Sequence, residues 1–141
     1  MNIKGAWLVV TGLFAASVFG AAAVAQEPSS VKGGVYTEEQ AKRGAMVYAE
    51  QCASCHGDLL TGNDPIPALA GADFQKKWQN VGELFDKTST SMPALAPGSL
   101  TGQQVADVLA HILSINKYPA GTTELASKVE PLVQIKIEPA N

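Results

Sequence analysis

The 141-residue sequence is poor in several residue types, and each shortage narrows what the protein can be. It contains two cysteines and two histidines, and aromatic residues make up 6% of the chain. Its 10 Lys and Arg residues are outnumbered by 13 Asp and Glu residues, and they form no basic stripe of the kind that binds nucleic acid. No internal repeat occurs, and no alternation of apolar and polar residues is long enough for a sheet. These absences predict an all-α protein without a nucleic-acid partner.

The N-terminal segment has the pattern of a signal peptide. Lys4 precedes residues 5–25, which carry no charge and end in Ala23-Val24-Ala25, the small-x-small pattern of a signal-peptidase site. We therefore predict a signal peptide over residues 1–25 and a periplasmic location in a bacterium. The alternative is an uncleaved membrane anchor, because about 20 apolar residues can span a bilayer.

The remaining chain divides into a flexible leader over residues 26–36, a domain over 37–119 and a C-terminal extension over 120–141. Helical spacing of apolar residues and capping-box patterns define the domain's helices. We expect a helix from Thr37 to Cys52, short helices over 72–79 and 81–89, and a last helix from Thr101 to about Asn116. Glycines and prolines predict loops over 57–71 and 92–98. We expect the C-terminal extension to be an extended tail, either free or packed on the body of the domain.

The decisive motif is Cys52-Ala53-Ser54-Cys55-His56, the C-x-x-C-H signature of covalent haem attachment. The spacing lets each thiol add to one vinyl group of the porphyrin. The next residue, His56, then places its imidazole at the iron as an axial ligand, provided that its other ring N–H is held by a partner. The motif predicts one haem c, bound through Cys52 and Cys55.

A zinc half-site and a redox dithiol are the alternatives for this motif. Zinc would need two further ligands, but His111 is the one other histidine and no other cysteine exists. A thioredoxin-like dithiol would need alternating strands and helices, which the pattern does not show.

Met92 is the predicted ligand on the opposite face of the iron, because a thioether is a common axial ligand of haem. It lies in the stretch Thr88–Pro93, which we interpret as a small-residue loop between two helices, stiffened by Pro93. The alternative is an ordinary core methionine. Met46 is too close to Cys52 to reach that face, and a packed or partly exposed His111 is favoured over a ligand.

Residues 38–119 resemble the small single-haem cytochromes c of the class I fold. The resemblance rests on the helix that leads into C-x-x-C-H, the Met92-Pro93 loop and the C-terminal helix. Gly44 and Tyr48 are similar to the glycine–aromatic pair where these two helices cross in that family. The resemblance implies several helices around one covalently attached haem.

The same resemblance assigns two further residues. Pro67-Ala68-Leu69 is similar to the family's Pro-x-Leu, which implies that the Pro67 carbonyl accepts the N–H of His56. Trp78 resembles, more weakly, a tryptophan that hydrogen-bonds a haem propionate. The stretch from Ser91 to Gly121 is similar to bacterial cytochromes found with quinoprotein dehydrogenases, although those often have a tyrosine where this chain has His111.

These observations predict an electron carrier and not an enzyme. It would accept electrons from a periplasmic dehydrogenase, for which a quinoprotein is one candidate, and pass them to a downstream cytochrome or oxidase. Two other hypotheses stay open at this point. If Met92 does not bind, the open iron face would allow catalysis or gas sensing, with His111 as the available imidazole. Alternatively, the chain is a fixed subunit of a larger dehydrogenase, docked through residues 120–141.

Overall fold

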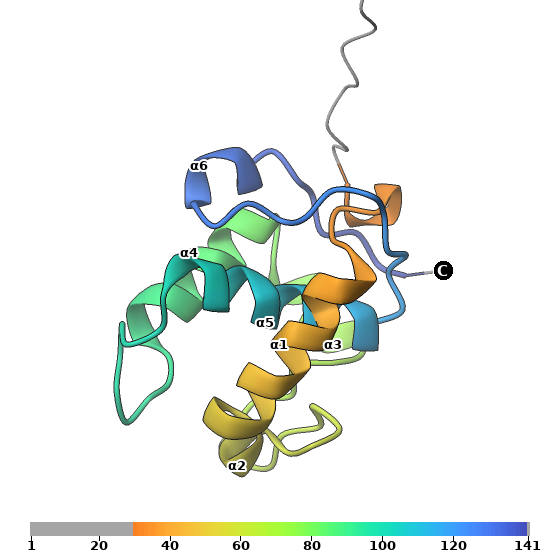
Figure 1. Ribbon diagram of the computed structural model, residues 1–141. Helices are drawn as coiled ribbons and strands as arrows, with labels where there is room; N and C mark the ends of the chain where they lie inside the picture. The colour runs from red at the N-terminus through yellow and green to blue at the C-terminus, as the bar shows by residue number, and fades with distance from the viewer. Residues whose placement is uncertain (1–29, 141) are drawn as a thin grey trace, which may run out of the picture.

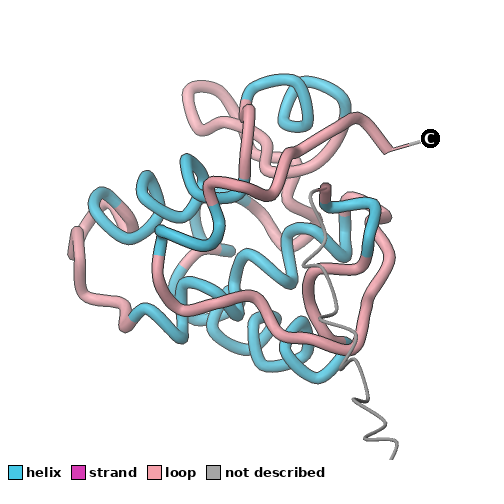
Figure 2. The backbone as a smooth tube through the Cα atoms, turned by 90° about the horizontal axis from the view of Figure 1, so that it is seen from above, coloured by secondary structure: helices cyan, strands magenta, loops and turns pink. Residues whose placement is uncertain are grey.

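The computed structural model describes residues 30–140, so the predicted signal peptide lies outside the described residues. Its elements are η1 (Val31–Gly33), α1 (Glu38–Gln51), α2 (Ala53–His56), α3 (Ala72–Lys77), α4 (Val81–Ser91), α5 (Gly102–Ile115) and α6 (Val129–Leu132) (Figure 1). Within residues 30–140, Figure 2 shows helices and loops but no strand. The predicted all-α fold is confirmed. None of the helices in this described part is long and apolar enough to cross a membrane.

The centre of the fold is the crossing of α1 over α5 (Figure 1). Gly44 makes the crossing close, because a Cβ atom at this position would overlap the backbone of Asp107. One turn further along, the Tyr48 ring packs against His111, with ring centroids 5.2 Å apart. The predicted pairing of Gly44 and Tyr48 at the crossing is confirmed. Helix α5 also buries a continuous stripe of apolar side chains. Burial of each fully buried leucine, such as Leu109 or Leu113, stabilises the folded state by about 1.5–3 kcal/mol.

The N-termini of the two crossing helices carry the same Thr-x-x-Gln pattern but use it differently. At α5, Thr101 and Gln104 form the complete reciprocal capping box. At α1, the Thr37 side chain accepts from the Gln40 backbone N–H, but the Gln40 side chain points elsewhere. Its amide donates to the Leu125 carbonyl over 3.1 Å and accepts from the Leu125 N–H over 2.8 Å. The fully buried Gln40 therefore clamps the C-terminal extension to α1.

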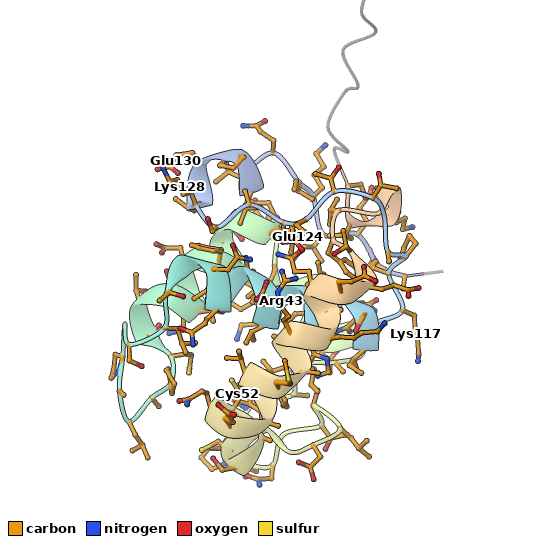
Figure 3. The ribbon with its side chains drawn as sticks, in the orientation of Figure 1. Arg43, Cys52, Lys117, Glu124, Lys128 and Glu130 are labelled. Atoms are coloured by element: carbon orange, nitrogen blue, oxygen red, sulfur yellow. The ribbon has the colours of Figure 1, made fainter. Side chains whose placement is uncertain are left out.

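Charged side chains also join α1, α5 and the C-terminal extension to one another. Arg43 of α1 donates through Nε and Nη2 to the two carboxylate oxygens of Asp107 on α5, over 3.1 and 3.0 Å. It also donates to Glu124 over 2.9 Å, and Figure 3 shows both labelled side chains together beside α1. These hydrogen bonds raise the pKa of Arg43, so the guanidinium stays charged at every ordinary pH.

Helix α4 extends further than the sequence pattern predicts. The stretch from Thr88 to Ser91, predicted as a loop, forms the last turn of α4, and Met92 is its C-cap. Four small hydroxyl side chains in this turn donate to carbonyls three or four residues earlier, which satisfies their hydroxyl groups within the helix. The donors are Thr88, Ser89, Thr90 and Ser91.

The leader differs from the flexible segment that its composition predicts, and the tail, predicted to be extended, is packed on the domain and contains a short helix. Residues 31–36 are packed, with Val31 fully buried and the Tyr36 hydroxyl donating to the Tyr118 carbonyl over 2.6 Å. The tail crosses the end of the molecule beside η1, at the top of Figure 1, and contains the short helix α6. Val31 donates its N–H to the Lys136 carbonyl over 3.0 Å. The two segments therefore stabilise each other, which a pattern search along either one does not reveal.

Candidate functional site

One cavity of about 440 Å³ collects every residue that the sequence nominated for the site. Its walls come from the end of α1, α2, the loop after α2, α4 and α5. The predicted site residues that line it are Cys52, Cys55, His56, Pro67, Trp78 and Met92. Leu84, Val108 and Ile112 form an apolar floor between them. Such a site, apolar with a few convergent polar groups, is the usual form of a cofactor pocket.

The two cysteines lie where α1 ends and α2 begins. Cys52 caps α1 by donating its N–H to the Tyr48 carbonyl over 2.9 Å, and Figure 3 labels it at the end of that helix. Both thiols are free, and burial, followed by the nearby Cys55, raises the pKa of Cys52 to about 11. A redox dithiol of the thioredoxin type needs a depressed thiol pKa. The raised value argues against that alternative.

His56 ends α2 and is held in one tautomer. Its Nδ1 lies 2.9 Å from the Pro67 carbonyl oxygen, which accepts and cannot donate, so Nδ1 carries the proton. The unprotonated Nε2 is then the nitrogen with a lone pair available to a metal. The residue as a whole is 8% exposed. The structure thus places Pro67 against His56 as the resemblance implied.

The loop after α2 brings Pro67 back to His56 through a tight backbone path. Gly62 donates its N–H to the His56 carbonyl over 2.8 Å and has a φ of +61°. A Cβ atom there would lie 2.6 Å from the Pro67 carbonyl carbon, so only glycine fits without displacement. Tyr48 closes the loop's other end by donating its hydroxyl to the Gly57 carbonyl over 2.8 Å. Burial raises the pKa of Tyr48 to about 12, so the hydroxyl keeps its proton.

Asn116 also positions the loop of the site, although the sequence indicates only that a helix ends there. It is buried at the end of α5, and its amide donates to the Leu69 carbonyl over 2.9 Å while its oxygen accepts from the Gly71 N–H over 3.0 Å. It therefore ties the His56 loop to α5. An asparagine after a helix and before Pro119 has the local pattern of a C-cap, and nothing in that pattern indicates partners more than 40 residues away.

Met92 reaches the cavity from the end of α4. It is half-buried, and its N–H donates to the Thr88 carbonyl over 3.1 Å. Pro93 ends the helix there, because proline cannot continue it. The thioether is thus presented by a helix terminus and not by a free loop. Met92 and His56 belong to different walls of the same cavity.

Trp78 supplies an observation that bears directly on what the cavity holds. Its indole Nε1 is the one buried side-chain nitrogen or oxygen, among the described residues, that has no hydrogen-bond partner. A buried unpaired donor costs about 1–3 kcal/mol, so such groups mark places where a ligand supplies the acceptor. Lys77 lies beside it, with Nζ 5.1 Å from the ring centroid. An acidic group entering the cavity at this wall fits both side chains.

The rival ligands do not join this site. His111 packs on Tyr48 and is absent from the cavity lining, and Met46 is 62% exposed on α1. Over residues 30–140, no three His, Cys, Asp or Glu side chains are grouped so that they could hold a metal ion, which argues against a zinc site. The residues present therefore fit a haem, with two thiols, one imidazole, one thioether and an unpaired donor on one apolar cavity.

Fold and site together define a class I c-type cytochrome. Residues 39–112, more than half of the chain, match the family model described as cytochrome c oxidase, cbb3-type, subunit III, and the chain belongs to this family. Family membership implies haem c and haem-based electron transfer.

Comparison with solved structures supports the same fold. The crystal structure of the sulfane dehydrogenase SoxCD from Paracoccus pantotrophus is similar, with a TM-score of 0.55 and 24% sequence identity. The match covers 86% of this chain and 68% of that one. At this identity the likeness shows the fold alone. No curated protein matches the sequence.

Proposed function

We propose that the protein is an exported electron carrier that holds one haem c through Cys52 and Cys55, with His56 and Met92 as axial ligands. The observation that carries the proposal is the convergence of these four residues on one cavity. When bound, the haem supplies one-electron Fe(II)/Fe(III) chemistry. The chain's own part is to hold the group, fill both axial positions and exclude water.

The axial residues are each fixed by a separate piece of backbone. Pro67 keeps Nδ1 of His56 protonated and its ring oriented, which also increases the basicity of the ligating nitrogen. The last turn of α4 positions Met92. A methionine ligand favours the ferrous state and raises the reduction potential, and an apolar floor does the same. With both positions filled by side chains, electron transfer is favoured over catalysis at the iron.

The chain's partners follow from its proposed location and charge. The predicted signal peptide supports a periplasmic location, where dehydrogenases supply electrons and cytochromes or oxidases accept them. The resemblance of residues 91–121 to cytochromes found with quinoprotein dehydrogenases favours a dehydrogenase as the donor, either as a separate partner or as a complex in which this chain is a fixed subunit. The formal net charge of −3 favours a partner with a basic docking surface, with an attraction that weakens as salt is added. Co-purification with a large subunit would favour the fixed-subunit form.

A reduced-minus-oxidised spectrum with a pyridine haemochrome tests the proposal. We expect one haem c per chain and the weak near-infrared absorption of a methionine–Fe(III) bond. Met92→Ala should abolish that absorption and lower the potential, whereas Met46→Ala, at an exposed position on α1, should change neither. An unchanged spectrum for Met92→Ala would show that another group binds the iron. Strong carbon monoxide binding by the reduced wild type at neutral pH would favour an open iron face.

A further inference from the structure

Trp78 stands in a three-residue connection, 78–80, between the end of α3 and the start of α4. Its indole lines the cavity, but its Nε1 makes no hydrogen bond within the described chain. Lys77, which lies against the ring, is itself exposed. Trp78 therefore has no hydrogen bond and only an exposed lysine beside its ring. These contacts do not explain how so short a connection keeps a large side chain at one place on the cavity wall.

The last described residues hold the 78–80 connection in place. We call residues 135–140 the brace. On the α3 side of Trp78, the Ala140 N–H donates to Gln75 Oε1 over 3.0 Å. Immediately after Trp78, the Ile137 N–H donates to the Gln79 carbonyl over 3.1 Å, and the Val81 N–H donates to the Ile135 carbonyl over 2.9 Å. The brace is therefore hydrogen-bonded on both sides of Trp78.

The brace is itself anchored at the end of the molecule away from α2. Its Ile135 and Ile137 side chains are buried, and Lys136 pairs through its backbone with Ser30 on one side and Asn80 on the other. The Tyr118 hydroxyl donates to the Glu138 carbonyl over 2.7 Å. The brace thus lies between the N-terminal segment and the 78–80 connection. A displacement of the brace must be transmitted to the residues that flank Trp78.

We propose that the brace is a positioning segment for Trp78, which holds the indole N–H at the cavity wall for an acidic substituent of the haem. This rests on the proposed function, because the acceptor belongs to the haem. An N–H directed at a carboxylate offsets part of its negative charge. Losing that donor stabilises the ferric state, so the potential falls. The C-terminal extension then sets a property of the cofactor that it does not touch.

Ile137→Pro and Ile137→Ala form a matched pair of variants of the holoprotein. Both lose the isoleucine side chain, but only proline also loses the N–H that donates to Gln79. We expect Ile137→Pro to lower the potential further than Ile137→Ala does, in the direction of Trp78→Phe. The Trp78 indole N–H, identified by its absence from the NMR spectrum of Trp78→Phe, should exchange with solvent at least tenfold faster in Ile137→Pro. Adding Ile137→Pro to Trp78→Phe should shift the potential no further.

A second pair of variants, which disturbs the fold less, keeps the test valid if Ile137→Pro fails to fold. Gln75→Ala removes the acceptor of the Ala140 N–H, whereas Gln75→Glu keeps an oxygen there. Both variants lose the amide nitrogen that lies 3.5 Å from the Asn116 carbonyl oxygen and Oδ1, so the two are matched in that respect. The alanine variant should show the faster exchange of the Trp78 N–H at smaller size, and the glutamate variant should restore the slow exchange. The potential is not compared within this pair, because the glutamate adds a negative charge. Glu124→Ala loosens the extension far from Trp78 and should leave the potential unchanged.

Two results would separate failure of this inference from failure of the proposed function. Equal potentials within the Ile137 pair and equal exchange rates within both matched pairs, in proteins that carry haem, would overturn the positioning role and leave the proposed function standing. A potential shift in Glu124→Ala as large as that in Ile137→Pro would also overturn it. Absence of haem from the wild type would overturn both.

Discussion

The two ends of the molecule treat their polar groups in opposite ways. At the end formed by η1, α6 and the tail, Gln40 uses both atoms of its side-chain amide, and the hydroxyls of Tyr36 and Tyr118 each donate to a carbonyl. At the cavity, Trp78 keeps an unpaired N–H. The most exposed large apolar side chain of the described residues also lies at the cavity, since Leu95 on its rim is 98% exposed, whereas Leu125 and Leu132 of the tail are buried and Val133 beside them is 44% exposed.

The difference shows which end of the molecule satisfies its buried polar groups within the chain, and which end requires another molecule to do so. A folded protein pairs its buried polar groups, so an orphaned donor beside an exposed apolar rim is costly unless a ligand or a partner covers it. The tail end is satisfied by contacts between segments of the same chain. We therefore expect changes at the cavity end to alter cofactor binding. Changes at the tail end should alter stability, and those in the brace should in addition shift the potential through Trp78.

The largest expected effect comes from removing both thiols at the cavity. Cys52→Ala combined with Cys55→Ala should eliminate covalently attached haem, because no other cysteine exists to form a thioether. Haem staining after denaturing electrophoresis checks this. Ser54→Ala, between the two cysteines, should stain like the wild type, and a stained band in the double variant would contradict the attachment.

Gly62→Ala should be the most destabilising single change in the loop that carries Pro67. The left-handed backbone costs alanine about 1–2 kcal/mol, and overlap with Ile66 and Pro67 adds roughly 1–3 kcal/mol. Gly98→Ala is the control, because φ there is +74° but the nearest atom, the Ser89 carbonyl oxygen, would be 3.8 Å from the new Cβ. Urea unfolding of the two variants measures the difference. Equal losses would show that the loop yields around Gly62.

Gln40→Leu tests the tail end. It leaves the buried N–H and carbonyl of Leu125 without partners, which should lower the free energy of unfolding by about 2–4 kcal/mol. Glu124→Ala, which removes an exposed ion pair from the same segment, should cost less than about 1 kcal/mol. Both should keep the wild-type methionine–iron absorption. Its loss in Gln40→Leu would show that the hydrogen bonds between Gln40 and Leu125 also determine the position of Met92.

The smallest effect concerns His111 at the helix crossing. Burial lowers its pKa, so the folded state binds its proton less readily than the unfolded state does. Stability is therefore lost as the pH falls from about 6.5, the unfolded pKa, through the folded value. His111→Phe should lose less stability than the wild type between pH 7.5 and pH 5.5, measured by urea midpoints. An identical loss in both proteins would mean that protonation of His111 does not contribute to the pH dependence of stability.

The cavity end was largely predictable from sequence because its chemistry depends on short motifs. Five consecutive residues indicate the attachment site, and Met92 is indicated by its thioether and its position before Pro93. The resemblance to class I cytochromes supplied Pro67 and Trp78, and all three predicted residues line the cavity. The local setting of Met92 was not predictable in the same way. Hydroxyl residues that usually signal a loop instead donate back to earlier carbonyls and prolong α4.

The tail end was hardly predictable, because its interactions join residues far apart in sequence. Gln40 looks like the third residue of a capping box, yet its side chain bonds Leu125, 85 residues away. Asn116 looks like an ordinary helix end, yet it holds the loop at Leu69 and Gly71. Each residue has an adequate local explanation, so its sequence neighbours give no reason to look for a distant partner.

The hydrogen bond of 2.6 Å between the Ser30 hydroxyl and Glu138 has a practical consequence for attaching this protein to other things. It brings the two ends of the described chain together, at the end of the molecule opposite α2 (Figure 1). A short peptide joining residues 30 and 140 should therefore close the domain into a ring without touching the cavity. Likewise, an electrode linker or fusion partner attached near residue 30 or 140 should leave the mouth of the cavity facing solution.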